Sequence, residues 1–257
     1  MAGRDPEGQV RWPATLQQWR AMTFFHWPYD ADQIRPFLPP GFEVDMWRGK
    51  AWVSLTAFRM VDFRLGSLPP AAGLSTFPET NLRTYVRGPD GRDGLWFLTL
   101  EADSLPLVVA ASNLYGVPYR WADMSVDVTT ADGGETIRYR SRRRANRPRG
   151  GGGRTDRDQH GPGHDILVRP GPPCPAPSEH DHWLTGRWRG YSRVAGRPVT
   201  VAVDHEPWPL HQATVLAFEE TLTADVGLAP PESEPLVHYS PGVRVRLGPP
   251  RPVPRPA

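Results

Sequence analysis

The chain has one cysteine and one lysine in 257 residues. Cys174 has no partner for an internal disulfide, and it lies among prolines, where a loop is expected. Lys50 follows Gly49 at an expected hairpin turn, where its amine is solvated and protonated at neutral pH. Enzymes that form an imine through lysine need a deprotonated amine in a pocket, so this chemistry is not expected here.

Long hydrophobic runs are absent as well. The longest apolar run, 105–111, is far too short to span a bilayer, and charged residues precede any apolar run at the N-terminus. A cytoplasmic protein that does not contact the membrane is therefore expected. The chain also has no Gly-rich phosphate loop, no nucleophile elbow and no paired cysteine motif, and these absences exclude many enzyme classes.

Turn-forming and aromatic residues are abundant. The 31 prolines and 25 glycines predict many turns and little long helix, and the ten Trp, nine Phe and seven Tyr supply large apolar surfaces for a core. Short helices are expected at 31–37 and 104–114. Alternating patterns predict strands over 19–27, 42–47, 51–64, 79–87, 95–103, 119–129, 135–143, 183–194, 198–205, 213–222 and 242–247, of which 213–222 is also compatible with a helix. We therefore expect a mainly β, α+β fold, a single domain over 1–257 that closes into a barrel and hides its own edges.

Two segments have a biased composition. Residues 144–177 are rich in Arg, Gly and Pro, which predicts a mobile loop, and 249–257 form a Pro-rich tail. The run 138–149 holds seven arginines and no acid. It is interpreted as an exposed strand end that continues into a basic loop, and contact with nucleic-acid phosphates is the less favoured alternative.

Two groups of histidines superficially suggest metal ligands. His205 and Glu206 precede His211, but Pro207 and Pro209 forbid the helix that would align a zinc site. The segment 180–182 carries two histidines around an aspartate, yet no third ligand is apparent. Neither a metal nor any other cofactor is predicted.

Five ordered segments resemble the uncharacterised YqjF-like family, the domain of unknown function 2071. They are 26–28 (HWP), 38–45 (LPPGFEVD), 77–86 (FPETNLRTYV), 94–98 (GLWFL) and 238–243 (HYSPGV). Together they span most of the chain, while 144–177 matches this family poorly.

A sixth segment, 114–121 (LYGVPYRW), resembles the active-site segment of acetoacetate decarboxylases. Those enzymes carry two adjacent lysines after the proline, where this chain has Tyr119 and Arg120. The resemblance implies a mixed β-barrel that encloses a central cavity. It places Glu79 on the active-site glutamate and Arg20 on an arginine of the first strand, but the imine-forming amine is missing.

These replacements suggest a site that holds an anion. Tyr119 can donate a hydrogen bond or relay a proton, and Arg120 can bind a carboxylate but cannot act as a base. With Arg20 and Glu79 they would suit an oxo-acid, although Arg20 and Glu79 can equally form a buried ion pair and Tyr119 can be a core residue.

Three further residues are candidates for the same site. Asn81 and Arg83 share a strand face with Glu79, so they line either this cavity or a polar exterior. His26 is a candidate ligand-binding residue, with a structural hydrogen bond as the alternative.

The sequence therefore leaves three hypotheses for function. The first is a protein that binds a small carbonyl or carboxylate ligand inside the barrel, without Schiff-base decarboxylase activity. The alternative is a lysine-independent enzyme of lyase or hydratase type, with Glu79 as base and Tyr119 as acid. A basic nucleic-acid-associated factor is the minor alternative. The expected partner is a small anionic molecule and not a membrane or nucleic acid, and a homo-oligomer stays open.

Overall fold

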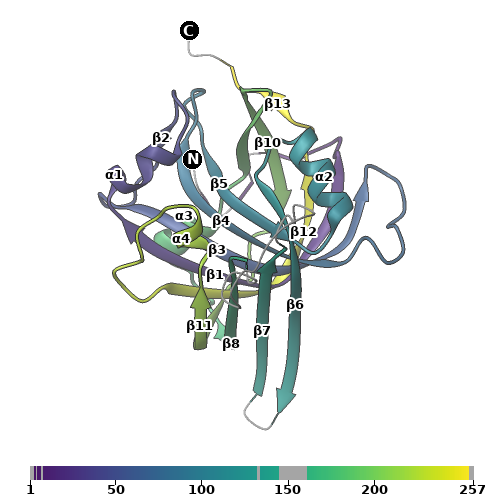
Figure 1. The fold of residues 1–257 in the computed structure, drawn as a ribbon, viewed down its shortest axis with the longest axis vertical. Coiled ribbons are helices and arrows are strands. Elements are labelled where there is room, and N and C mark those ends of the chain that lie inside the picture. The colour runs from purple at the N-terminus through teal and green to yellow at the C-terminus, as the bar shows by residue number, and fades with distance from the viewer. Residues whose placement is uncertain (1–2, 4, 7, 132–133, 145–160, 255–257) are drawn as a thin grey trace, which may run out of the picture.

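The computed structural model describes residues 3, 5–6, 8–131, 134–144 and 161–254. In chain order its elements are β1 Thr15–Tyr29, α1 Ala31–Ile34, the 3-10 helix η1 Arg35–Phe37, β2 Glu43–Val44, β3 Ala51–Leu65, β4 Phe77–Arg87, β5 Asp93–Ala102, α2 Leu105–Leu114, β6 Tyr119–Ala131, β7 Gly134–Arg143, β8 Gly163–Pro173, α3 Glu179–Thr185, β9 Arg189–Val194, β10 Arg197–His205, β11 His211–Glu220, α4 Leu222–Asp225, β12 Leu236–Leu247 and β13 Arg251–Pro252 (Figure 1).

The described strands pair into one sheet that closes on itself twice. The larger ring is a nine-stranded barrel made of β1, β3, β4, β5, β6, β7, β8, β11 and β12. It is mixed, because β5 and β6 run parallel while its other neighbours run antiparallel. The smaller ring adds β9 and β10 to five of the same strands, β1, β3, β4, β5 and β12. The predicted mainly β fold with a closed mixed barrel is confirmed.

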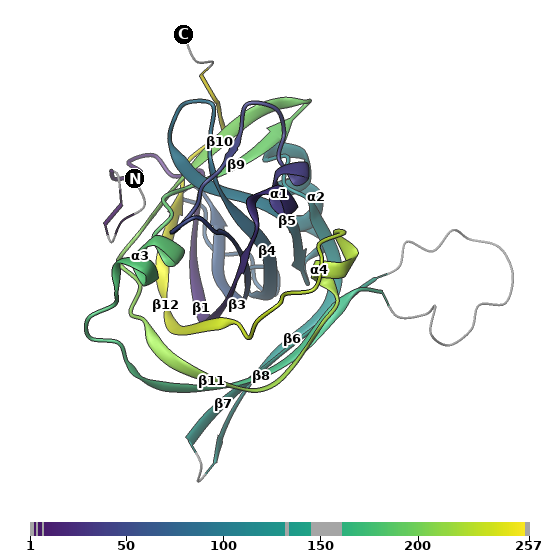
Figure 2. The same cartoon turned by 90° about the vertical axis from the view of Figure 1, so that its left-hand side faces the viewer.

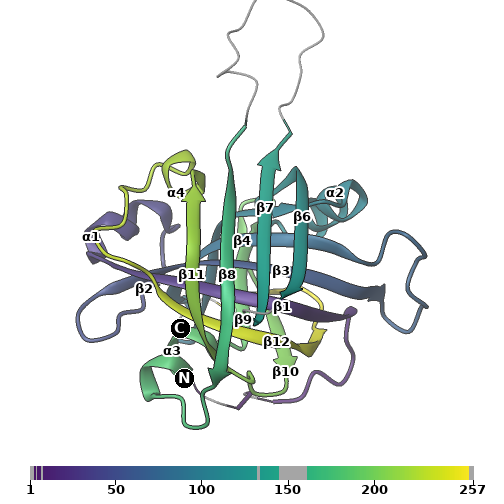
Figure 3. The same ribbon diagram turned by 90° about the horizontal axis from the view of Figure 1, so that it is seen from below.

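The five shared strands form a wall between the two rings. In Figure 2, β6, β7, β8 and β11 lie on one side of this wall and β9 and β10 on the other, and Figure 3 shows β7 and β8 crossing β1 and β3 at a steep angle. Because successive side chains of a strand point to opposite faces, each shared strand contributes to both interiors. Phe25, Leu55 and Leu82 fill the nine-stranded barrel with apolar side chains from its outer strands, such as Ile137 and Ile166.

A β-bulge in β1 changes which residues face which ring. The register against β3 shifts between Arg20 and Thr23, and Ala21 has a φ of 48°. Such a bulge inserts an unpaired residue and so reverses the alternation of the side chains that follow. Trp19 before the bulge and Met22 after it therefore face the same, smaller ring.

Several expectations about single elements are corrected. The loop predicted over 144–177 is wrong for Gly163–Pro173, which forms β8, because its backbone pairs with both β7 and β11 despite its prolines and glycine. Residues 145–160 of that expected loop lie outside the described residues. The strand expected from 183 begins only at Arg189, since Ser178 caps helix α3 through the Asp181 amide.

Other expectations are confirmed or refined. The strands expected over 79–87, 95–103, 119–129 and 135–143 are present as β4 to β7 and pair as two hairpins, α2 ends at Leu114, and β11 is a strand. The expected strand over 42–47 shrinks to β2, which pairs with β4 and not with β3. In the predicted tail, β13 pairs with β10 and 255–257 lie outside the described residues. Within the described part of the chain, no helix is long and apolar enough to cross a membrane.

Candidate functional site

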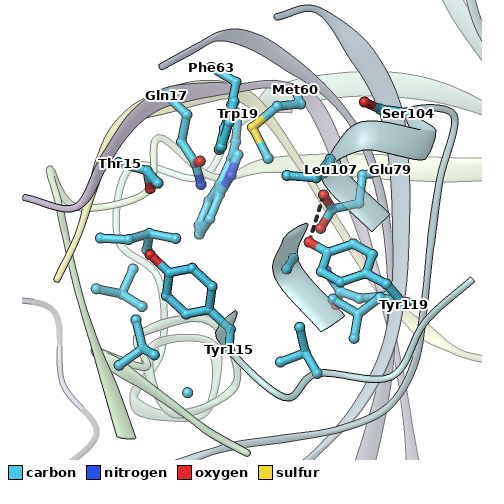
Figure 4. A pocket seen from close by; sticks show the side chains of 18 of the residues that line it. Thr15, Gln17, Trp19, Met60, Phe63, Glu79, Ser104, Leu107, Tyr115 and Tyr119 are labelled. Carbon is cyan, nitrogen blue, oxygen red and sulfur yellow. Dashed lines mark hydrogen bonds between the residues drawn. The ribbon is translucent and has the colours of Figure 1, made fainter. Parts of the chain in front are cut away.

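A cavity of about 440 Å³ lies inside the smaller ring. Each of its seven strands and helix α2 contribute to the lining, and most of the lining side chains are apolar or aromatic. Figure 4 shows Trp19, Met60, Phe63 and Leu107 around this space. The polar groups of the site are few, and each has a defined environment.

Glu79 and Tyr119 form a hydrogen-bonded pair in the cavity wall. The Tyr119 hydroxyl donates to Glu79 Oε2 at 3.1 Å, and the close-up view shows both side chains in the same space (Figure 4). Burial raises the pKa of Glu79 to about 8, although the bond from Tyr119 lowers it. At neutral pH the Glu79 carboxyl is therefore mostly protonated. Burial and the neighbouring Glu79 raise the pKa of Tyr119 well above its usual value, so the pair carries little charge.

Arg83 supplies a buried positive charge on the same strand. It is 7% exposed and lines the cavity two and four residues beyond Asn81 and Glu79. Among the described residues no carboxylate pairs with it, its Nε has no hydrogen-bond partner, and its contact is with the ring of Phe24 at 5.7 Å. Burial and the nearby charge of Arg187 lower the pKa of Arg83. A buried guanidinium without an anion is energetically costly, so this position favours a negatively charged ligand.

Arg187 lies near Arg83, but two aspartates already balance its charge. Its Nη1 bonds to Asp45 at 2.7 Å and to Asp93 at 3.1 Å, and its Nε donates to the carbonyl of Trp183. Its Nη2 is buried and has no partner among the described residues, although Arg187 lines the cavity. Arg187 can therefore add a hydrogen-bond donor to an anion held by Arg83.

Apart from Arg64, which is exposed, the remaining polar side chains of the wall are neutral. Burial lowers the pKa of His205 to about 4, so its imidazole is uncharged at neutral pH. Within the described residues, Asn81 Oδ1 and Trp19 Nε1 are buried without hydrogen-bond partners. Together with Arg83 they provide one acceptor and several donors for a bound molecule.

Four predicted site residues lie in this cavity: Glu79, Asn81, Arg83 and Tyr119. Arg20 and Arg120 do not. Each directly follows a residue that faces the cavity, Trp19 or Tyr119, so the alternation of the strand turns its side chain to the opposite face. Arg20 is exposed and bonds to Gln18, which rules out both its predicted ligand-binding role in this cavity and the alternative of an ion pair with Glu79.

Arg120 lies in a different environment. It is exposed and lines a second cavity of about 430 Å³ together with Arg143 and Arg193. Arg120 shares a face of β6 with Val126, which packs in the core of the nine-stranded barrel, so it does not meet Glu79. The predicted convergence of Arg20, Glu79, Tyr119 and Arg120 on one cavity is therefore replaced by a site in which Arg83 carries the positive charge.

His26 lies in the protein interior but does not line the cavity. It is fully buried, and its Nδ1 contacts the Tyr85 hydroxyl at 3.1 Å. The His238 ring lies 6.0 Å away and pairs with Asp181 of α3 at 3.1 Å. Burial lowers the pKa of His26 and His238, so both are neutral at neutral pH. This cluster connects α3 to the barrel.

Lys50 lies outside both cavities. It is exposed at the turn between Trp47 and β3, and its Nζ pairs with Asp30 at 2.6 Å. The hydrogen bond from Asp30 and its charge raise the pKa of Lys50, which keeps the amine protonated. The chain therefore places no lysine in the cavity.

Sequence reasoning missed several lining residues. Thr185 ends α3 and Arg187 follows it, in a segment that was expected to be a strand, and Tyr115 lies beyond α2. His205 was considered only as a metal ligand. Its position in a strand, alternating with Val203 and Val201, is the signal that would have placed it on the cavity face. Within the described residues, no group of three or more His, Cys, Asp or Glu could hold a metal ion.

The basic run is largely neutralised where it is described. Four of its arginines pair with acids: Arg138 with Asp165, Arg140 with Asp127, Arg143 with Glu101 and Asp225, and Arg144 with Asp123. Residues 145–149 of the run lie outside the described residues.

Comparisons with solved structures identify the fold. An acetoacetate decarboxylase-like enzyme from Sphingomonas wittichii RW1 superposes with a TM-score of 0.60 at 14% identity, over 96% of both chains. Acetoacetate decarboxylase from Legionella pneumophila gives 0.58 at 13% identity, over 97% of this chain and 91% of that one. The enduracididine biosynthesis enzyme MppR, complexed with pyruvate, gives 0.57 at 16% identity, over 96% and 93%. This chain therefore has an acetoacetate decarboxylase-like fold.

Sequence comparisons identify the family. The uncharacterized protein YqjF of Bacillus subtilis (strain 168) is 32% identical over 225 residues, which cover 87% of this chain and 86% of that protein. A family model described as an uncharacterized conserved protein, domain of unknown function 2071, matches residues 16–244. The resemblance seen in the ordered sequence segments is confirmed, and the chain belongs to this YqjF-like family of uncharacterised conserved proteins.

Proposed function

We propose that this protein binds a small organic anion, a carboxylate or a carbonyl compound that carries one, in the cavity of the smaller ring. The observation that carries the proposal is Arg83, a guanidinium that is buried in the cavity wall with no carboxylate among the described residues to pair with it. A carboxylate in the cavity would offset the cost of burying this charge and would accept hydrogen bonds in the geometry that guanidinium favours. The related fold of MppR, which is complexed with pyruvate, supports this class of ligand.

The proposed activity does not include Schiff-base decarboxylation. The single lysine of the chain is exposed and paired with Asp30, and Tyr119 cannot condense with a ketone. Borohydride is therefore expected to trap no adduct when the protein is incubated with acetoacetate. A stable adduct on Lys50, detected by mass spectrometry, would overturn this part of the proposal.

Ligand binding is tested by the melting temperature of the protein in a panel of carboxylates and their neutral amides. A ligand that binds only the folded state raises the melting temperature, and at a hundredfold excess over its dissociation constant it stabilises by about 2.7 kcal/mol. The shift is expected with carboxylates, to be small with amides, and to be lost in Arg83→Met. The matched control is Arg20→Met, which removes an exposed arginine and should keep the shift. Equal shifts in both variants would contradict the proposal.

A lysine-independent enzyme is the second candidate, and Glu79 favours it. A carboxyl with a pKa of about 8 that is hydrogen bonded to a tyrosine can exchange protons near neutral pH, as general acid–base catalysis requires. Because Glu79 holds its proton below that pKa, it would act as an acid at neutral pH and as a base only in more alkaline solution. The expected reactions are hydration or lyase steps beside a carboxylate.

The two candidates are separated by Glu79→Gln. An enzyme should lose turnover in this variant and keep its affinity for the anion, because Arg83 is untouched. The rate of the wild type should change with an apparent pKa near that of Glu79. If no substrate of the panel is converted although the anion binds, the protein is a binding protein.

A further inference from the structure

The cavity is larger than a small oxo-acid requires. Its volume of about 440 Å³ falls in the range of roughly 300–1,000 Å³ that encloses drug-sized ligands. Since a water molecule takes about 30 Å³, the space equals on the order of fifteen waters. An acid of three or four carbons bound at Arg83 would leave most of it unfilled.

The two polar features of the cavity lie far apart along β4. Glu79 and Arg83 face the same side of the strand four residues apart, which separates their backbones by roughly 13 Å. A ligand that reaches both must therefore be elongated.

The Arg83 end of the cavity is closed and polar. Its lining residues Arg187, Thr185 and His205 are all buried, and three tryptophan or tyrosine rings (Tyr85, Trp183 and Trp208) pack around them. This end offers donors from Arg83 and Arg187 without access to bulk water.

The other end is open and mostly aliphatic, and its charged lining residue is the exposed Arg64, next to Leu65. Leu65, Leu68 and Leu74, on the segment that leads from β3 into β4, and Leu114 of α2 line the cavity and are 55%, 60%, 56% and 61% exposed. Glu79 is the third residue of β4 and therefore close to the segment that carries Leu74. The open mouth lies at the Glu79 end of the cavity, opposite the Arg83 end.

Helix α2 turns an apolar face to the same end of the cavity. Leu107, Ala110, Ala111 and Leu114 follow the spacing of one helix face, and Figure 4 shows Leu107 in the lining of the cavity that also holds Glu79. No charged side chain occurs in the sequence of α2. The cavity therefore has the buried guanidinium of Arg83 at one end and an exposed, largely apolar mouth at the other.

We infer that the ligand is an amphipathic carboxylate, with its head at Arg83 and an apolar chain that passes the Glu79–Tyr119 pair and ends between the mouth leucines. The inference rests on the proposed function, because it takes the same anion site as its starting point. With carbon–carbon bonds of about 1.5 Å, an extended zigzag chain advances about 1.25 Å per carbon, so about ten carbons cover the roughly 13 Å of β4 between Arg83 and Glu79, and longer chains reach further into the mouth. An oxygen substituent about ten carbons from the head would meet the hydroxyl of Tyr119.

The test is isothermal titration of the full chain with the sodium salts of butanoate, hexanoate, octanoate and decanoate, with pyruvate for comparison. Each added methylene that is buried should raise the affinity about fourfold up to ten carbons. Leu114→Ser should weaken decanoate several-fold and leave butanoate unchanged. Its matched control is Leu216→Ser, which alters an exposed leucine of β11 away from this cavity and should change neither.

The possible results separate this inference from the proposed function. If pyruvate and butanoate bind through Arg83 and longer chains gain nothing, the chain-length inference is wrong and the anion site stands. If decanoate and decan-1-ol bind equally well and Arg83→Met changes neither, the anion site itself is wrong, and the inference with it. Absence of binding by every acid of the series overturns both.

Discussion

Glu79 should make the stability of this protein depend on pH in a direction opposite to that of an ordinary surface carboxylate. Its pKa is about 8 in the folded state because of burial, against an ordinary value of 4.5. Below pH 4.5 the group is protonated in the folded and the unfolded chain. Between 4.5 and 8 the unfolded chain releases the proton and the folded chain keeps it, so unfolding becomes more favourable as the pH rises.

The size of this effect follows from the shift. One pKa unit corresponds to about 1.4 kcal/mol, so the full window from 4.5 to 8 can remove up to about 5 kcal/mol from the free energy of unfolding. Relaxation of the cavity would reduce this value. Glu79→Gln keeps an uncharged side chain of the same shape and an acceptor for Tyr119, so it should lose the pH-dependent term and little else.

The measurement is urea unfolding of the wild type and Glu79→Gln between pH 5 and 9. Buried histidines with lowered pKa values, such as His205 and His164, destabilise both proteins below pH 6.5, so they cancel in the difference. The variant should gain stability relative to the wild type by several kcal/mol across the range. Glu43→Gln, at an exposed position of β2, is the control and should give a flat difference. Parallel stability curves for Glu79→Gln and the wild type would refute the reasoning.

Three further predictions concern two residues of the cavity lining, Tyr119 and Arg83, and the turn at Gly116. Tyr119→Phe removes the hydrogen bond that lowers the pKa of Glu79, so the titration of Glu79, followed by NMR, should move up by about one unit; an unchanged midpoint would mean that the bond does not form. Arg83→Met removes a buried charge that has no carboxylate partner among the described residues, and urea unfolding of the ligand-free protein should show it to be more stable by roughly 1–3 kcal/mol; a loss of stability would point to a compensating acid. Gly116→Ala should cost at least about 2 kcal/mol in the same assay, because Gly116 has a φ of +62° and an added Cβ would lie 2.0 Å from the Arg193 carbonyl oxygen. Gly49→Ala, also at positive φ but in open space, is the matched control and should cost less, whereas equal costs would contradict the clash.

Much of the fold was accessible from local patterns. The hairpins of β4 with β5 and of β6 with β7 follow from alternating residues on either side of Gly-rich turns. β8 was not accessible, because its segment contains several prolines and glycines and lacks a clear alternation. Its strand state depends on the neighbours β7 and β11, which pair with its backbone from both sides.

The site was predicted in part, because alternation along a strand shows which of its residues share a face. Alternation along one strand correctly grouped Glu79, Asn81 and Arg83 on a common face. The same rule, applied to adjacent residues, also separates Tyr119 from Arg120 and Trp19 from Arg20. Placing both members of such pairs in one cavity therefore conflicted with strand geometry.

The sequence by itself determined the family, the predominance of strands and the absence of a lysine that could form an imine, because these depend on residue identity and order. Only the tertiary structure decided which ring encloses the cavity and which arginine lies in it. The bulge at Ala21 reverses the facing of β1, and the closure of β9 and β10 over the shared strands buries Arg83 and Glu79. Burial of this kind comes from strands far apart in the chain, and it converts an ordinary arginine and glutamate into the proposed anion site and a carboxyl that keeps its proton at neutral pH.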